Sequence, residues 1–66
     1  MMEGIVISYS DIKGFGFILG EDQERYFVHY SNILMDGFQT LQIEDIVEFD
    51  PDENEKGLYA KNVRKT

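Results

Sequence analysis

The sequence predicts an all-β fold, a small five-stranded antiparallel barrel with Greek-key connections. Five short runs of β-branched and aromatic residues alternate with turn residues, and no stretch predicts a long helix. The chain has 66 residues, so we expect one domain over 1–66 that buries about 60% of its unfolded surface. Closing the sheet into a barrel removes its open edges, which favours this architecture for so short a chain.

The first two strands are predicted at 4–10 and 15–19, joined by a turn at 11–14 whose Asp and Gly suit tight backbone geometry. The register of strand 4–10 stays open. Either Val6 faces the interior and the odd-numbered residues face outward, or the reverse.

The third strand is predicted at 25–30, after a polar connection at 20–24. Ser31 is a suitable N-cap for one helical turn over 32–35. The segment 38–44 shows no clear pattern, so we expect a loop or a frayed extended segment there.

The fourth strand is predicted at 45–50, where apolar and acidic residues alternate, and the fifth at 58–63. The acidic segment 51–57 is expected to be a turn, since its proline excludes a central strand. The interior of the barrel can be filled by residues at alternate positions: Val6, Ile18, Val28, Ile33, Val47, Phe49 and Val63.

The charge balance bears on possible partners. Thirteen acidic and six basic residues give a net charge of −7, which repels polyanions at long range. Nucleic acid is not excluded, because single-strand binders gain about 1–3 kcal/mol per base from stacking on aromatic side chains.

Composition also limits the compartment and the cofactors. The chain has no cysteine, so we expect neither a disulfide nor a thiolate metal site. No apolar run approaches the roughly 18 residues of a membrane span, and the start lacks a signal-peptide pattern. We therefore expect a cytoplasmic protein that does not enter a membrane.

Aromatic side chains gather in the second and third predicted strands. Alternation places Phe15 and Phe17 on one face of their strand, and Phe27 and His29 on one face of the next. If the two strands pair as a hairpin, four rings lie side by side with Lys13 at the margin. Such a surface can stack bases, although alternation alone leaves open that the phenylalanines fill the core.

Two motifs in these strands, together with shorter matches, resemble a known family. The segments are Lys-Gly-Phe-Gly-Phe-Ile at 13–18, Phe-Val-His-Tyr-Ser at 27–31, Asp-Gly-Phe at 36–38 and Lys-Asn-Val at 61–63. They resemble the bacterial cold-shock domain, an OB-fold that binds single-stranded RNA and DNA. The first motif also resembles part of an RRM motif, but an RRM needs two helices that this chain does not offer.

The resemblance implies a stacking surface and assigns its residues. It comprises Phe15, Phe17, Phe27, His29, Tyr30 and Phe38, with Lys13 near the phosphates, and with Tyr9, Lys56 and Lys61 as peripheral candidates. The implied role is that of an RNA chaperone or antiterminator with no enzymatic activity, no catalytic residues and no cofactor or metal. We expect single-stranded RNA or DNA as the partner and a monomeric protein.

Three departures from the family pattern affect this expectation. Ile7 and Ser8 stand where the family has Lys and Trp, which removes a phosphate contact and a stacking platform. At about 1–3 kcal/mol per platform, affinity falls by about 5- to 150-fold. Tyr26 replaces a core Val, so its hydroxyl needs a partner. Glu44 replaces a turn Gly, which adds strain if that position requires a positive φ.

The alternative function is a diverged OB-fold that binds proteins, since strand 4–10 is apolar and the overall charge is acidic. His29 has no second His and no Cys with which to form a metal or catalytic site. The acidic stretch 50–55 lacks the spacing of an EF-hand calcium loop.

Overall fold

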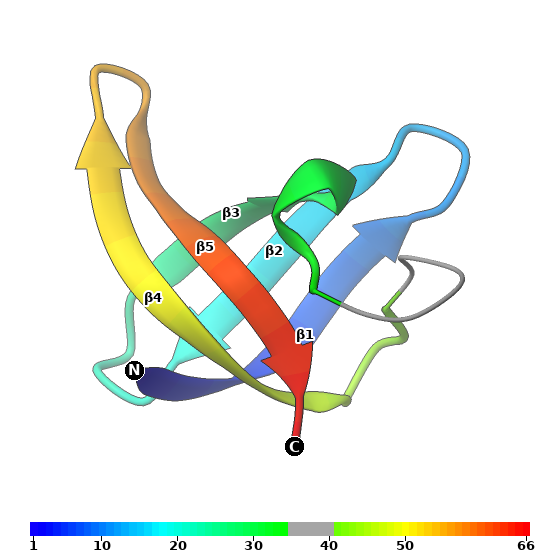
Figure 1. The fold of residues 1–66 in the computed structure, drawn as a ribbon, viewed down its shortest axis with the longest axis horizontal. Helices are drawn as coiled ribbons and strands as arrows, with labels where there is room; N and C mark the ends of the chain where they lie inside the picture. The colour runs from blue at the N-terminus through cyan, green and yellow to red at the C-terminus, as the bar shows by residue number, and fades with distance from the viewer. Residues whose placement is uncertain (35–40) are drawn as a thin grey trace.

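The computed structural model describes residues 1–34 and 41–66 and confirms the predicted fold class. The strands form a closed barrel in the order β1-β2-β3-β5-β4 (Figure 1). The elements are β1 (Met2–Ser10), β2 (Phe15–Gly20), β3 (Arg25–His29), a 3-10 helix (Tyr30–Asn32), β4 (Ile46–Asn54) and β5 (Gly57–Lys65). The first and last strands extend slightly beyond their predicted limits.

The strand pairings explain how the barrel closes. β1 pairs antiparallel with both β2 and β4, β2 with β3, and β4 with β5. β3 and β5 instead run parallel, with Phe27 beside Tyr59, and a further parallel bridge joins Ile33 to Val63. This parallel contact joins the β1-β2-β3 meander to the β4-β5 hairpin, and a purely antiparallel arrangement would not have included it.

The core settles the open register of β1. Val6 is fully buried and Ile7 is exposed, so Val6 faces the interior. All seven predicted core residues are buried, and Tyr26, Leu41 and Ala60 join them. The phenylalanines of β2 and β3 are therefore not needed to fill the barrel.

The prediction that Pro51 ends the fourth strand is wrong. Pro51 lies inside β4, opposite Ala60 of β5. The pairing of β1 with β4 ends at Met2 and Phe49. Beyond Phe49, β5 is the one strand paired with β4 in the described part of the chain. A proline on such a free edge removes no hydrogen bond that a second neighbour would need.

The helical turn also lies earlier than predicted. It is a 3-10 helix over Tyr30–Asn32, capped by His29, rather than a turn over 32–35 capped by Ser31. The His29 side chain accepts a hydrogen bond from the Ser31 backbone N–H, so an imidazole nitrogen takes the role expected of a hydroxyl. β3 consequently ends at His29, and Tyr30 begins the turn.

Glu44 has a φ of 76°, in the left-handed region that favours glycine. The turn around it is fixed to β1 by two backbone hydrogen bonds. Glu44 N–H donates to the Val6 carbonyl at 2.7 Å, and Val6 N–H donates to the Asp45 carbonyl at 2.9 Å. The expected strain at this position is therefore present.

Tyr26 finds the hydroxyl partner that its position requires. Its ring packs on Phe49 at 5.0 Å between centroids, and its hydroxyl donates to Asp22 Oδ2 at 2.7 Å. This hydrogen bond, with burial, raises the pKa of Tyr26 to about 12, and the same bond lowers the pKa of Asp22.

We expect the domain to lose stability between about pH 10 and about pH 12 through Tyr26. A folded-state pKa above the unfolded value of about 10 stabilises the fold below pH 10, and this contribution disappears as the pH rises through the folded pKa. Urea unfolding at a series of alkaline pH values measures the loss. Tyr26→Phe should show a smaller loss over this range, and an equal loss in both proteins would contradict the assignment.

Candidate nucleic-acid interface

Five aromatic side chains from β2, β3 and the 3-10 helix form the feature that we call the aromatic surface. Its members are Phe15, Phe17, Phe27, His29 and Tyr30. The hairpin register places Phe15 opposite His29 and Phe17 opposite Phe27. Phe17 is 40% exposed, Phe27 36% and Tyr30 48%. These rings are therefore open to solvent in a domain whose core is filled without them.

The phenylalanine rings contact one another directly. The Phe27 centroid lies 5.6 Å from that of Phe15, with the planes tilted by 34°, and 5.8 Å from that of Phe17, in an edge-on arrangement. These separations fall within the favourable range for aromatic pairs, about 4.5–7 Å. Each ring thus restricts its neighbours, and Phe27 lies at the centre.

Two glycines allow the neighbouring backbone and ring to approach closely. A Cβ on Gly16 would lie 2.1 Å from the Ser8 carbonyl oxygen, so only glycine allows β1 to pair this closely with β2. Gly14 has a φ of 77°, and a Cβ there would lie 2.8 Å from the Tyr30 ring. Tyr30 N–H also donates to the Gly14 carbonyl at 2.9 Å. The Gly-Phe-Gly-Phe pattern therefore places Tyr30 as well as the phenylalanines.

His29 is held by the residue that follows Tyr30. The Ser31 hydroxyl lies 2.8 Å from His29 Nδ1, and the Ser31 backbone N–H donates to the same nitrogen. A neutral imidazole that accepts at Nδ1 carries its proton on Nε2. The Nε2–H group is then a donor that suits the carbonyl oxygens of a base, beside a Tyr30 ring whose centroid lies 4.5 Å away.

The β1 side of the aromatic surface carries no ring. A bulge between Val6 and Ser8 shifts the register, so that Ser8 lies opposite Phe17 and Ser10 opposite Phe15. Ser8, at the position where the family has Trp, is exposed and cannot stack a base.

Tyr9 is not part of the aromatic surface, contrary to its place among the peripheral candidates. It lies opposite Gly16, packs against the core and is half-buried. Burial, followed by the charge of Asp11, raises the pKa of Tyr9. The bulge that turns Ser8 outward is what directs Tyr9 to the inner side.

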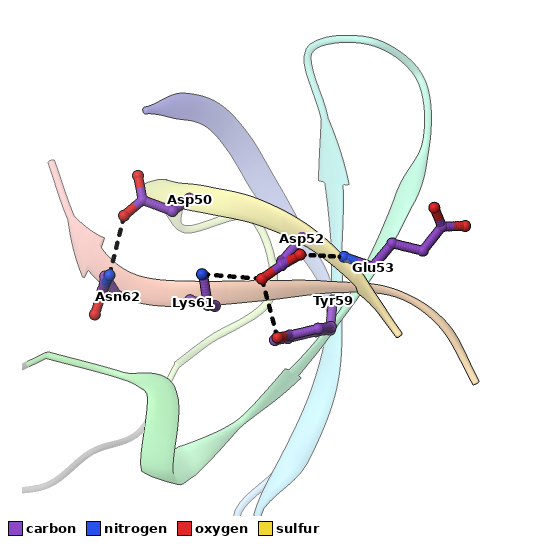
Figure 2. Close-up of polar contacts among 6 residues, drawn as sticks. All are labelled: Asp50, Asp52, Glu53, Tyr59, Lys61 and Asn62. Carbon is purple, nitrogen blue, oxygen red and sulfur yellow. Dashed lines mark hydrogen bonds and ion pairs between the residues drawn. The ribbon is translucent and has the colours of Figure 1, made fainter. Parts of the chain in front are cut away.

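The predicted cations have different surroundings. Lys13 is exposed in the turn before β2. Lys56 lines a groove between the β4-β5 turn and the aromatic surface. Lys61 instead forms an ion pair with Asp52, with Nζ 2.9 Å from Oδ2 (Figure 2), so its charge is locally balanced. The remaining predicted site residue, Phe38, lies outside the described residues.

Two residues that the sequence did not single out lie beside the aromatic surface. Tyr59 pairs with Phe27 across the parallel contact of β3 and β5, and Arg25 begins β3. Both line the same groove as Lys56. Alternation around the buried Ala60 could have indicated that Tyr59 faces outward, but not which strand lies beside it.

Within residues 1–34 and 41–66, no group of three His, Cys, Asp or Glu side chains is placed to hold a metal ion. No helix in this same part of the chain has the length and apolar character needed to cross a bilayer.

Comparison with known families gives this arrangement a context. The sequence profile of the 'Cold-shock' DNA-binding domain matches residues 2–66. The chain belongs to the cold-shock domain family. The cold-shock domains are nucleic-acid-binding, non-enzymatic modules whose ligands are single-stranded, so nucleic-acid binding is the activity of the family and catalysis is not.

Individual relatives agree with the family assignment. A "Cold shock-like protein" of Aquifex aeolicus is 52% identical over 92% of this chain and 89% of its own length. The "Cold shock-like protein CspA" of Stigmatella aurantiaca is 50% identical over 97% of this chain and 96% of its own. Among solved structures, "drosophila Unr CSD456" superposes with a TM-score of 0.77 and 32% identity, over 98% of this chain and 26% of that longer one.

Proposed function

We propose that this cold-shock domain binds short unpaired segments of RNA or DNA by stacking bases on Phe15, Phe17, Phe27, His29, Tyr30 and Phe38, with Lys13 near the phosphates. The observation that carries the proposal is the aromatic surface itself. Solvent-exposed, mutually contacting rings are unfavourable on a small domain unless something covers them. Flat bases complement such a surface.

Stacking accepts any base, so sequence selectivity is low, with some preference for pyrimidines. The His29 Nε2–H donor, fixed through Ser31, suits a base carbonyl oxygen, which thymine, uracil, cytosine and guanine carry and adenine lacks. A strand held in this way is unavailable for hairpin formation. The cellular role that follows is that of an RNA chaperone or antiterminator.

Affinity is lower than for a domain with a Trp in β1. Ser8 supplies no ring opposite Phe17, and one platform contributes about 1–3 kcal/mol. Ile7, at the position where the family has a Lys, removes a phosphate contact in addition.

Binding should depend only weakly on salt. Each phosphate contact on a single strand contributes about 0.7 to the slope of log K against log salt concentration, so two contacts give about −1.4. The net charge of −7 limits the number of such contacts. Fluorescence anisotropy of a labelled oligothymidine over a range of salt concentrations measures the slope, and a slope steeper than about −4 would refute stacking as the main source of affinity.

An amide NMR titration of the isotope-labelled protein with oligothymidine and with oligouridine tests the proposed function. The expected result is that shifts concentrate in 13–17, 27–30 and at Phe38, while amides of β4, which contributes no residue to the aromatic surface, remain unchanged. A folded protein that shows no shifts at millimolar ligand would refute the proposal.

A second candidate, a protein-interaction module, is favoured by one specific observation. Ile5, Leu19 and Ile46 contribute apolar side chains to a shallow depression that shares no residue with the aromatic surface, and Ile46 is exposed. Ile5 and Ile46 are cross-strand partners, so the patch spans the β1-β4 pair. If the nucleic-acid titration is silent, this patch is where a protein partner should be sought.

A further inference from the structure

We propose that Tyr59 is an additional stacking platform that extends the aromatic surface onto β5. The inference rests on the proposed function and names a site residue that neither the sequence motifs nor the family resemblance supplied. In this proposal the bound nucleic-acid strand lies across β2, β3 and β5 and does not extend onto β1.

The strand registers carry the first step of the argument. Ser8 lies opposite Phe17, Phe17 opposite Phe27, and Phe27 opposite Tyr59, so these four residues form one row across four strands. Cross-strand partners lie on the same face of a sheet with their Cβ atoms about 4.5–5.5 Å apart. The row has no ring at its β1 end, at Ser8, and has a ring at its β5 end.

The shape of the surface supplies the second step. Phe17, Phe27 and Tyr59 line one groove of about 580 Å³, together with residues of the β4-β5 turn. Grooves of about 300–1,000 Å³ are the usual size for small-molecule sites. Bases stacked on Phe17 and Phe27 would therefore have the Tyr59 ring as the next wall.

The charged side chains of the groove also suit a nucleic-acid strand. Arg25 and Lys56 line this groove, and neither forms an ion pair with any residue that the structure describes. In a chain with a net charge of −7, two unpaired cations beside three aromatic rings suit a ligand that is both flat and anionic. A single nucleic-acid strand has both properties.

The Tyr59 ring is held in place before any ligand arrives. Its hydroxyl donates to Asp52 Oδ2 at 3.1 Å, and Lys61 Nζ lies 2.9 Å from the same oxygen. The other Asp52 carboxylate oxygen accepts from the Glu53 N–H at 2.8 Å, so the carboxylate is fixed on two sides (Figure 2). A ring with a fixed orientation loses less conformational entropy when a base stacks on it.

The electrostatic effects agree with this role. A tyrosine is uncharged at neutral pH at its ordinary pKa, and the hydrogen bond to Asp52 raises the pKa of Tyr59 further, so the ring does not repel phosphate. The hydrogen bond from Lys61 is the main reason that the pKa of Asp52 is lowered, so Asp52 remains an acceptor. Lys61 thus acts as a support for Asp52 and Tyr59 rather than as a phosphate contact.

Anisotropy of a fluorescein-labelled oligothymidine, measured with the full chain and two variants, tests the inference. Tyr59→Leu removes the ring but keeps an apolar side chain, and we expect affinity to fall by about 5-fold or more. Tyr59→Phe is the matched control, since it keeps the ring and loses the hydroxyl, and we expect affinity within about 2-fold of the parent protein. Circular dichroism of each variant checks that the barrel is intact.

The possible outcomes separate this inference from the proposed function. If the parent protein binds and Phe27→Ala weakens binding but Tyr59→Leu does not, Tyr59 is not a platform and the proposed function stands. If Tyr59→Phe loses as much affinity as Tyr59→Leu, the hydroxyl carries the effect and stacking at Tyr59 is refuted. If the parent protein binds no oligonucleotide, both proposals fail.

A measurement on the unaltered protein keeps the test decisive should Tyr59→Leu fail to fold. Stacked bases shift ring protons upfield, so the Tyr59 ring resonances should move upfield when oligothymidine is added. The ring of Tyr26, which is buried beneath the sheet, provides the internal control. Unchanged Tyr59 resonances at saturation would overturn the inference.

Discussion

Replacing Phe27 by alanine is expected to weaken oligothymidine binding by about 150-fold, close to the upper limit of about 3 kcal/mol for one stacking platform. The large effect follows from its central position. Its ring contacts those of Phe15 and Phe17, at 5.6 and 5.8 Å between centroids. Truncation therefore removes one platform and releases two others from contacts that orient them.

The domain should remain folded in this variant, because Phe27 is 36% exposed and lies outside the core cluster. Anisotropy titration measures the affinity, and urea unfolding measures the stability. Ile43→Ala is a suitable control, since Ile43 is 64% exposed and outside the aromatic surface. Unchanged affinity in folded Phe27→Ala would show that bases do not stack there.

Replacing Gly16 by alanine is expected to have the largest effect on stability, about 3 kcal/mol or more. A Cβ at Gly16 would lie 2.1 Å from the Ser8 carbonyl oxygen and 2.6 Å from the Tyr9 Cα. Both are backbone atoms of the paired strand, so no side-chain rotation relieves the overlap and β1 must move away from β2. A domain of this size has a total stability of only about 3–10 kcal/mol, so the substitution would remove about a third of it or more.

Urea unfolding followed by circular dichroism measures this loss. Gly57→Ala is the matched control, because a Cβ there meets nothing within 4 Å and the cost comes from its φ of +127° alone. Strain of this kind corresponds to about 1–3 kcal/mol. If Gly16→Ala lost no more stability than Gly57→Ala, close packing of β1 on β2 would not be the reason for glycine at this position.

The fold was predictable from the sequence because the core residues alternate with polar or exposed residues along each strand. Val6, Val47 and Phe49 are buried at the positions that alternation assigned to them, once the register of β1 is known. The prediction that Pro51 ends the fourth strand failed because the sequence shows only that a proline lacks an N–H donor. Whether that donor is needed depends on where β1 stops pairing with β4, which no local pattern contains.

The same distinction between local pattern and long-range pairing explains which residues of the candidate site were predictable from the sequence. Phe17 and Phe27 were predicted to be neighbours because a hairpin is a local structure and its register follows from a short connection. Tyr59 was missed because its proximity to Phe27 depends on the parallel contact that closes the barrel, between segments far apart in sequence. Ser8 faces outward and Tyr9 faces the interior because of the β-bulge between Val6 and Ser8, and strict alternation along the strand does not predict a bulge.

Among the residues that the structure describes, β4 beyond Phe49 has one edge without a partner strand, and this edge has a consequence for self-association. Unpaired strand edges offer hydrogen-bonding groups to other chains and can start aggregation. Here the edge carries Pro51, which has no N–H to offer, and the carboxylates of Asp50, Asp52 and Glu53. Like charges would face one another if two copies aligned at this edge. The β4-β5 hairpin, which projects beyond the other strands in Figure 1, is thereby protected against strand addition by its own sequence.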